Sequence, residues 1–514
     1  MLTALKQFWS YFVPRSSISS EEDSEDKPAG LPVPNSSKSF WHTEPSEFLL
    51  GHRTTNELPE YADVVIIGSG ITGTSAARFL SEDDKGKKLK VLMLEAREAC
   101  WGATGRNGGH CQPLLFDRSA EVALFELKNY DTVRSYISDN NVPCEWRTVT
   151  GCRTLWTPEL LKDATSEVEQ LKKDHPDIGA RVSIITDPED LKKHRIAGNA
   201  GCSGATLTNF AGSLWPYKYV AFILEKLVRS GFLNLQTSTP VKKLSVVSHV
   251  NDKARWVLHT DRGEMRARHV IIATNGYTSH IVHEFADLIL PVRGEMSALL
   301  PPLGSARLPD SYGFVGAQGG DANRDDYLIQ RPFEGVPNAA GHLMFGGGSA
   351  WAKLNAMGET DDSVIDEGAA KYLRTTLLEM MELGGTEQDV QELKAANQWT
   401  GIMGYSRDNH PWVGALPGKK GLWMSAGYTG HGMPNGTLCG KAVVDMLLAD
   451  ENGADMAKVQ QDMVEKGDIP KLYLLTQERI DNARALPTVK TQYDEGHIGN
   501  FEAKQLNGNV KRLV

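Results

Sequence analysis

A continuous apolar run marks the first predicted strand. Residues 62–68, ADVVIIG, are almost uninterrupted in hydrophobic character and rich in β-branched residues, which is typical of a strand buried on both faces. Small and apolar residues then recur at helical spacing through 74–83, TSAARFLSED, and a second apolar run, KVLMLEA, occupies 90–96. This order predicts a strand, a tight turn, a helix and a second strand.

Later segments continue the mixture of helix and strand patterns. Trp215 and Pro216 open a long amphipathic helix, because proline is favoured in the first helical turn. Residues 255–274 predict a hairpin around Asp261–Gly263 that leads into a buried strand. Composition and pattern further predict strands at 291–300, 327–332 and 342–348, a covering helix over 363–383, and a surface loop or lid over 301–325.

Composition is that of a globular protein and argues against several kinds of partner. The chain has 514 residues, of which 40% are hydrophobic, and a formal net charge of −10. A polyanion held by a basic surface is therefore not expected, and we predict no nucleic-acid partner. The six cysteines form no CxxC pair and no ligand-like grouping with histidines, which predicts neither a metal site nor a disulfide scaffold. The sequence also lacks a run of about 18 apolar residues, which excludes an ordinary membrane-spanning helix.

The first 39 residues differ from the rest. Within 1–15, apolar residues recur at helical spacing, which fits a membrane-contacting segment, a transit segment, or a docked or frayed terminus. Residues 16–39 are rich in serine, acidic residues and proline, and predict a disordered acidic linker. We therefore expect the folded body to begin near Phe40. The expected location is intracellular and cytoplasmic, with a mitochondrial or membrane-peripheral location as the alternatives.

A glycine motif follows the first predicted strand. Gly68, Gly70 and Gly73 have the GxGxxG spacing of a dinucleotide-binding turn, in which the glycines permit the tight turn, the approach of a pyrophosphate and close helix packing. The pyrophosphate would lie at the helix N-terminus, where free N–H groups favour negative charge. Glu95 ends the second strand, 22 residues after Gly73, and is the expected acceptor for ribose hydroxyls.

A second glycine-rich stretch, EACWGATGRNGGHCQP, occupies residues 98–113. Glycines at this density let backbone groups lie against a flat polycyclic ring, and Arg106 and Asn107 can donate to the edge of such a ring or to phosphates. The alternative is a loop with several positive φ angles and no ligand.

Four segments together carry a resemblance to a known family. They are the fingerprint with Glu95, the GATGRNGG loop (102–109), HVIIATNGYTS (269–279) and GYTGHGMPNGTLCGKAVVDML (427–447). In combination they resemble the FAD-dependent D-amino-acid-oxidase/glycine-oxidase (DAO) superfamily, nearest to its gamma-glutamylputrescine-oxidase-like members, over roughly residues 40–455. The resemblance implies an α/β (α+β) fold: a glutathione-reductase-type, Rossmann-like FAD-binding domain with an interleaved substrate domain of mainly antiparallel sheet plus helices.

The resemblance also implies a domain organisation. Residues 1–39 form the N-terminal extension, and 40–287 hold FAD-binding segments with substrate-domain elements interleaved at about 145–215. The substrate domain continues through 288–395, a C-terminal FAD-binding segment spans 396–455, and helices and a tail fill 456–514.

FAD is the implied cofactor, bound without a covalent link. Its binding residues are expected to come from all four segments, with backbone at Val241 facing the adenine. The full implied set is Gly68, Gly70, Ile71, Thr72, Gly73, Glu95, Ala96, Arg97, Gly102, Ala103, Thr104, Arg106, Asn107, Gly108, Gly109, Val241, Ala273, Thr274, Asn275, Gly276, Gly427, Gly430, His431, Gly432 and Met433.

The turn at Gly427–Gly432 precedes a helix predicted to begin near Pro434 or Asn435, whose N-terminus would face the flavin pyrimidine. His431 is either a donor there or a packed loop histidine. The catalytic candidates are His110, Tyr428 and His431. Further pocket candidates are Trp399, Tyr405, Arg293 and Arg331, and Cys111 and Cys439 lie in or near cofactor segments without matching a covalent attachment site.

The implied reaction is oxidation of the C–N bond of a primary or secondary amine or amino acid. Hydride passes to flavin, an imine is formed, and dioxygen or another acceptor reoxidises the flavin, with hydrogen peroxide as the product from dioxygen. Two alternatives stay open: a flavin monooxygenase or dehydrogenase of a natural-product pathway, and a non-catalytic flavoprotein in trafficking or regulation.

Overall fold

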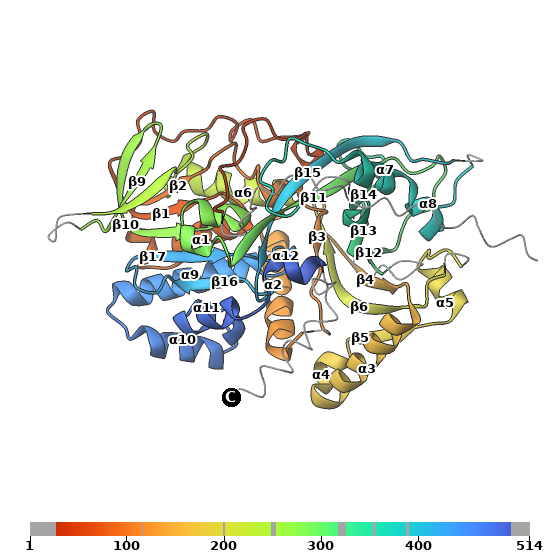
Figure 1. The fold of residues 1–514 in the computed structure, drawn as a ribbon. Helices are drawn as coiled ribbons and strands as arrows, with labels where there is room; N and C mark the ends of the chain where they lie inside the picture. The colour runs from red at the N-terminus through yellow and green to blue at the C-terminus, as the bar shows by residue number, and fades with distance from the viewer. Residues whose placement is uncertain are drawn as a thin grey trace, which may run out of the picture.

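Two β-sheets organise the molecule. The computed structural model describes residues 27–116, 118–198, 201–247, 253–316, 325–352, 356–386 and 390–494. One sheet and its helices form the left half of Figure 1, and the second sheet forms the right half. The segment 1–15 that we predicted to be amphipathic lies outside the described residues.

The first sheet is the parallel sheet that the apolar runs predicted. β1 (Tyr61–Ile67) pairs in parallel with β2 (Val91–Leu94) on one side and β10 (Gly263–Ile272) on the other. The strand order is β16-β17-β10-β1-β2-β7, with the antiparallel hairpin strands β8 and β9 beside β10. The remaining bounds are β7 Leu233–Gln236, β8 Lys243–Val246, β9 Trp256–Thr260, β16 Trp412–Ala415 and β17 Leu422–Ala426. Strands far apart in sequence therefore form one nucleotide-binding sheet.

Two helices from opposite ends of the chain pack together on this sheet. α1 (Ile71–Glu82) follows the GxGxxG turn, and α9 (Gly436–Glu451) contacts it. The close approach depends on small residues, because a Cβ added at Gly440 would lie 2.7 Å from the carbonyl oxygen of Thr72. α6 (Pro216–Arg229) also contacts α1 and begins at the predicted proline.

The second sheet is mainly antiparallel. Its order is β15-β11-β14-β13-β12-β4-β6-β3, with β5 beside β6, and only β12 and β4 pair in parallel among its described strands. The bounds are β3 His110–Cys111, β4 Arg147–Leu155, β5 Val182–Ile185, β6 Gly204–Ser213, β11 Ile289–Leu299, β12 Asp310–Val315, β13 Asp325–Gln330, β14 Leu343–Gly347 and β15 Ala395–Ser406. The three strands that we predicted after residue 288 are confirmed as β11, β13 and β14.

Two expectations about this sheet are corrected. Residues 310–315 of the predicted 301–325 loop form β12, whose apolar side chains are buried between β4 and β13. The boundary at residue 396 also fails, because β15 pairs with β11 along its length and so belongs to the second sheet. The sequence pattern did not predict β12 or assign β15 to this sheet, because polar and glycine residues surround both strands. Their side chains are buried by strands that are distant in sequence.

Helices cover the second sheet and the region between the two sheets. α2 (Ala120–Asp139) contacts both α9 and β6 and thus joins the two halves. The helices nearest the second sheet are α3 Pro158–Asp174, α4 Pro176–Gly179, α5 Pro188–Lys193, α7 Glu367–Thr375 and α8 Leu377–Met380. The C-terminal helices are α10 Met456–Glu465, α11 Gln477–Arg484 and α12 Val489–Asp494.

The linker prediction is wrong for residues 27–39. Ala29 and Ser39 are buried, and the Ser37 amide donates to the Asp362 carbonyl at 2.8 Å. Arg106 donates to the Ser36 hydroxyl at 3.2 Å and to the Ser37 carbonyl at 2.6 Å. The packed body therefore begins near residue 29, because backbone and hydroxyl contacts offset a composition poor in apolar side chains.

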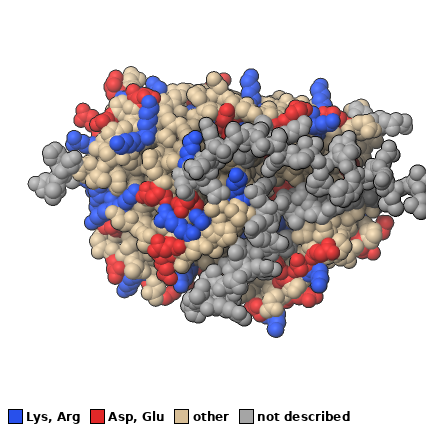
Figure 2. All heavy atoms as spheres, in the orientation of Figure 1, with Lys and Arg blue, Asp and Glu red and all other residues tan. Residues whose placement is uncertain are grey.

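Charges are mixed on the surface. On the face drawn in Figure 2, acidic and basic side chains are interspersed among uncharged ones. None of the helices in the described part of the chain is long and apolar enough to cross a membrane.

Candidate active site

One large cavity lies where the two sheets meet. Its volume is about 1360 Å³, compared with about 300–1,000 Å³ for ordinary small-molecule pockets. The residues that follow β1, β2 and β10 line one end of it, and strands of the second sheet line the other. The carboxyl ends of parallel strands are where open α/β sheets bind nucleotides. The cavity therefore has room for a dinucleotide and for a second molecule beside it.

The three fingerprint glycines have different surroundings. A Cβ added at Gly73 would lie 2.0 Å from the Gly68 carbonyl oxygen, so this glycine allows α1 to pack on β1. Gly68 has φ +102°, and its added Cβ would lie 2.6 Å from the Ala273 carbonyl. At Gly70, by contrast, the only described atoms within 4 Å belong to the side chain of Thr104. Gly70 thus keeps the backbone accessible from the cavity, as a pyrophosphate requires.

Glu95 lies at the end of β2 and lines the cavity. Its Oε2 accepts from the Ser69 hydroxyl at 2.6 Å and the Ser69 amide at 3.0 Å, and its Oε1 accepts from the Arg97 amide at 3.0 Å. These contacts hold the carboxylate in place at the edge of the nucleotide site. A carboxylate has about four lone-pair positions, so it retains capacity for a ribose hydroxyl.

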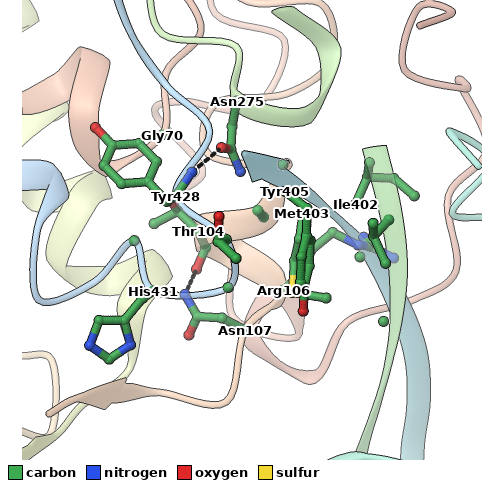
Figure 3. Close-up of a pocket in the computed structure, with 18 of the residues that line it drawn as sticks. Gly70, Thr104, Arg106, Asn107, Asn275, Ile402, Met403, Tyr405, Tyr428 and His431 are labelled. Atoms are coloured by element: carbon green, nitrogen blue, oxygen red, sulfur yellow. Dashed lines mark hydrogen bonds between the residues drawn. The ribbon is translucent and has the colours of Figure 1, made fainter. Parts of the chain in front are cut away.

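The GATGRNGG loop folds against α1 through its side chains. Thr104 Oγ1 accepts from the Ile71 amide at 3.0 Å. Asn107 donates to the Thr104 carbonyl at 3.0 Å (Figure 3). It also accepts from the Gly109 amide at 2.8 Å. Gly102, Thr104, Asn107 and Gly108 all line the cavity. The expectation that this loop approaches a ligand therefore fits its position.

Arg106 lines the cavity, but its side chain donates to protein acceptors. Its Nε donates to the Thr400 carbonyl at 2.6 Å, and its terminal nitrogens donate to Ser36 and Ser37. Nε also lies 3.4 Å from the buried carboxylate of Asp362. The guanidinium thus fastens the loop to β15 and to the N-terminal segment, and its donors are directed at protein acceptors rather than at a ligand.

The C-terminal turn lies across the cavity from this loop. The amide of Tyr428 donates to Asn275 Oδ1 at 3.3 Å (Figure 3). The amide of Gly427 donates to the same oxygen at 3.0 Å. α9 begins at Gly436, close to the predicted start. Its first turn is partly satisfied by protein groups, because the Gly436 amide donates to Gly432 and the Leu438 amide donates to Asn129 Oδ1 at 2.9 Å.

Most of the expected cofactor-binding residues line this cavity. The exceptions are four glycines, which are packed against neighbouring protein atoms instead: Gly73, Gly109, Gly276 and Gly427. A Cβ at Gly276, for example, would lie 2.5 Å from the Met403 carbonyl. Their glycine identity therefore serves close packing beside the site.

The three catalytic candidates line the cavity but differ chemically. The Tyr428 hydroxyl is bound to Thr72 at 2.9 Å and Ser425 at 2.7 Å, and burial raises its pKa well above the usual value. His110 Nδ1 lies 2.8 Å from the Ser311 hydroxyl, and burial lowers the pKa of this histidine to about 3. His431 Nε2 lies 3.2 Å from Glu126. Of the three candidates, Tyr428 is the one whose polar side-chain atom is hydrogen-bonded to two protein hydroxyls.

The further candidates divide into lining and structural residues. Tyr405 and Arg293 line the cavity. Trp399 is fully buried and donates to the Arg106 carbonyl at 2.8 Å, and Arg331 pairs with Glu145 and lies over Phe40 and Trp215. Neither of these two residues belongs to the cavity wall, and neither do Cys111 and Cys439.

Sequence reasoning missed the polar residues of the second half of the cavity. They are Gln112, Arg118, Arg153, Asp325 and Tyr327, together with the fully buried Glu126 behind His431. Of these residues, only Glu126 could have been found from the sequence. It is an acidic residue at a position on the apolar face of α2, between Val122 and Val133. Arg153, Asp325 and Tyr327 lie on strands, and Gln112 and Arg118 lie between β3 and α2, where the local pattern does not reveal their neighbours.

The sequence profile of the FAD dependent oxidoreductase family, DAO, matches residues 63–446. The chain belongs to this family. It is therefore an FAD-dependent oxidoreductase. The glycines at Gly70 and Gly102, which we call the glycine cradle, fit that cofactor. An added Cβ at Gly102 would meet no described atom within 4 Å, and one at Gly70 would meet only the Thr104 side chain.

Relatives agree with this membership. "Probable oxidoreductase OrdL" of Haemophilus influenzae is 26% identical over 410 residues, covering 76% of this chain and 84% of its own length. Gamma-glutamylputrescine oxidoreductase of Escherichia coli is 23% identical and covers 76% of this chain and 85% of its own. The glycine oxidase structure from Geobacillus kaustophilus superposes with a TM-score of 0.62 at 19% identity, over 78% of this chain and 98% of its own. The mixed α/β fold is thus shared with solved members of the family.

Proposed function

We propose that this protein oxidises the C–N bond of an amine or amino acid and releases an imine. The observation that carries the proposal is the continuity of the cavity, which runs from the FAD cradle at Gly70 to a polar chamber on the second sheet. Relatives named for gamma-glutamylputrescine and glycine support a substrate with an amino group.

The polar chamber is suited to an amine that also carries other polar groups. Arg153 and Tyr327 line it from β4 and β13, and Arg293 and Glu295 line it from β11. A site with both cationic and carboxyl side chains can orient a zwitterionic or polyamine-like molecule by complementary charge. The aromatic ring of Tyr327 packs edge-on to His110 with centroids 5.1 Å apart, which supplies an apolar wall.

When bound, FAD supplies the acceptor for the two electrons and the hydrogen that leave the α-carbon. Gly70, Glu95 and the loop at Thr104 and Asn107, all on the cavity wall, would hold the cofactor. Burial keeps His110 neutral, because it lowers the pKa of that histidine to about 3. We propose non-covalent attachment, since Cys111 and Cys439 stand outside the cavity wall, and dioxygen as the acceptor that regenerates the oxidised cofactor.

The direct test is anaerobic. Purified protein is mixed with glycine, N-methylglycine, putrescine and gamma-glutamylputrescine, and the visible absorbance of the flavin is followed. Bleaching by at least one of these amines supports the proposal. Bleaching by NADPH and by none of the amines would instead identify a monooxygenase-type enzyme.

A further inference from the structure

A histidine on the cavity wall is joined to a carboxylate buried behind it. Nε2 of His431 lies 3.2 Å from Oε2 of Glu126. The Glu126 side chain is completely buried, whereas 27% of the His431 side chain stays exposed. Because His431 also lines the cavity, the pair connects the interior of the protein to the space where a substrate would bind.

Glu126 is held as an anion. Oε2 accepts from the Leu114 amide at 2.8 Å, and Oε1 accepts from Asn435 Nδ2 at 3.0 Å and from Arg118. Burial opposes ionisation of this carboxyl group, but the charges of Arg118 and His431 and the hydrogen bonds from His431 and the Leu114 amide outweigh it and lower its pKa to about 2. The carboxylate can therefore only accept a hydrogen bond from the imidazole.

This contact selects the tautomer of the neutral histidine. When Nε2 carries the hydrogen that Glu126 accepts, Nδ1 carries the lone pair. In the described part of the chain, Nδ1 of His431 has no hydrogen-bond partner. The arrangement is that of a general base oriented by a buried carboxylate.

We propose that His431 accepts a proton from the ammonium form of the substrate and that Glu126 positions it for this step. The inference rests on the proposed function. One N–H bond of the ammonium group breaks and its electron pair stays on nitrogen, while the proton forms a new bond to Nδ1. No electron leaves the amine in this step, and the resulting imidazolium is stabilised by the Glu126 carboxylate.

The step matters because only a neutral amine has the lone pair that assists loss of hydride from its α-carbon. An aliphatic amine with a pKa of about 10.4 is neutral in roughly one molecule in 2,500 at pH 7. A base in the active site lets the enzyme use the abundant ammonium form. General bases typically increase the reaction rate about 10²–10⁴-fold.

His110, His410 and Arg118, which also line the cavity, are unsuited to the role. Burial lowers the pKa of His110 to about 3 and that of His410 to about 4, so neither takes up a proton near neutral pH. Arg118 is a cation paired with Glu126. His431 differs from these residues because it both contacts the Glu126 carboxylate and lines the cavity as a histidine.

The test compares His431→Gln and Glu126→Gln with the wild-type holoenzyme. Glutamine at 431 can still donate to Glu126 but cannot act as a base. The matched control is His259→Asn, which breaks a similar pair on the β9–β10 hairpin, where Nδ1 lies 2.8 Å from Glu264. The readout is the anaerobic rate of flavin reduction between pH 6 and 10.5, with whichever of glycine, N-methylglycine, putrescine and gamma-glutamylputrescine reduces wild type fastest.

We expect His431→Gln to reduce flavin about 10³-fold more slowly than wild type at pH 7 and to recover to within about threefold near pH 10.5, where about half of the amine is already neutral. Glu126→Gln should show a smaller loss of about 10-fold or more with the same recovery, and His259→Asn should match wild type. FAD content and melting temperature check that each variant is folded.

An equal rate for His431→Gln and wild type at pH 7 would overturn the inference, as would a loss that is constant across the pH range. Failure of every amine to reduce wild type would instead overturn the proposed function.

Calorimetry with tert-butylamine, which lacks an α-hydrogen, gives a reading independent of turnover. At pH 7.5, in two buffers of different ionisation enthalpy, wild type should bind it without releasing a proton. His431→Gln should release about one proton per amine or fail to bind. Binding by His431→Gln without proton release would contradict a base at this position.

Discussion

The amide of Ile71 donates a hydrogen bond to Oγ1 of Thr104 across 3.0 Å. This contact joins the first turn of α1, which follows the GxGxxG motif, to the second glycine-rich loop, 33 residues later. It aligns the two backbones along one side of the cavity. Two motifs that are separate in sequence therefore form one continuous surface of the cavity, where we propose that FAD binds.

Gly70 tests this surface directly. In Gly70→Val the new Cβ would lie 3.1 Å from Thr104 Oγ1, and the branched side chain would cover the backbone that faces the cavity. We expect FAD affinity to fall at least about 100-fold, or roughly 2.8 kcal/mol. The measurement is fluorescence titration of the apoprotein with FAD.

The control for this substitution is Gly198→Val. Described atoms leave the space around an added Cβ at Gly198 open, and the residue is outside the cavity wall. Full FAD content in purified Gly70→Val would show that the cofactor does not approach this turn.

Glu95 should hold the ribose end of the cofactor. A hydrogen bond to a charged acceptor is worth about 1.5–3 kcal/mol, so Glu95→Ala should weaken FAD binding about ten- to hundredfold. Glu95→Gln, which keeps one carbonyl acceptor for Ser69, should lose less FAD affinity than Glu95→Ala. Glu264→Ala on the exposed hairpin serves as the control. Equal FAD dissociation constants for wild type and Glu95→Ala would contradict the ribose assignment.

The segment 27–39 should be needed for cofactor retention. Leu31 and Pro32 line the cavity, and Ser36 and Ser37 accept hydrogen bonds from Arg106. Deletion of residues 1–38 removes these contacts and leaves the terminal nitrogens of the buried Arg106 guanidinium without their Ser36 and Ser37 acceptors, so we expect a lower melting temperature and loss of bound FAD. Deletion of residues 1–26 leaves the same contacts in place and should preserve both. Retention of FAD by the longer deletion would contradict this role.

The nucleotide half of the site could be predicted because its chemistry is local. The spacing of Gly68, Gly70 and Gly73 and the position of Glu95 follow from backbone sterics within one strand, turn, helix and strand. Arg106 and Arg331 could not be assigned, because their acceptors at Thr400 and Glu145 are distant in sequence.

The second half of the cavity depends on non-local pairing. Polar residues such as Arg153 on β4 acquire their position only when β4 pairs with β12 and β6, which lie on either side of it. The predicted loop at 301–325 concealed β12 for the same reason. Glu126 is the exception, since an acidic residue on the apolar face of α2 predicts a buried partner.

Glu295 should make stability depend on pH. Burial raises its pKa to about 7, against the opposing effects of the Asp366 amide and Arg293. The folded state thus favours the protonated carboxyl group. The contribution of Glu295 to the free energy of unfolding is complete below about pH 4.5 and is lost as pH rises through 7. The loss is on the order of 3 kcal/mol.

Glu295→Gln should remove this dependence, because the amide stays neutral. Urea unfolding of both proteins at pH 5 and pH 8, in saturating FAD, gives the difference in unfolding free energy. We expect wild type to lose stability relative to Glu295→Gln between pH 5 and pH 8. An unchanged difference at the two pH values would show that Glu295 is solvated.

The most direct test of amine oxidation follows the hydrogen on the α-carbon. Wild-type holoenzyme is mixed anaerobically with putrescine or with putrescine deuterated at both α-carbons, flavin bleaching is timed by stopped flow, and the carbonyl compound formed by hydrolysis of the imine is quantified. We predict severalfold slower bleaching with the deuterated amine and one equivalent of carbonyl product and of ammonia per flavin reduced. If putrescine is not oxidised, glycine and its α-deuterated form serve in the same way. Absence of bleaching by both amines and by gamma-glutamylputrescine and N-methylglycine, in protein that retains FAD, would contradict C–N bond oxidation.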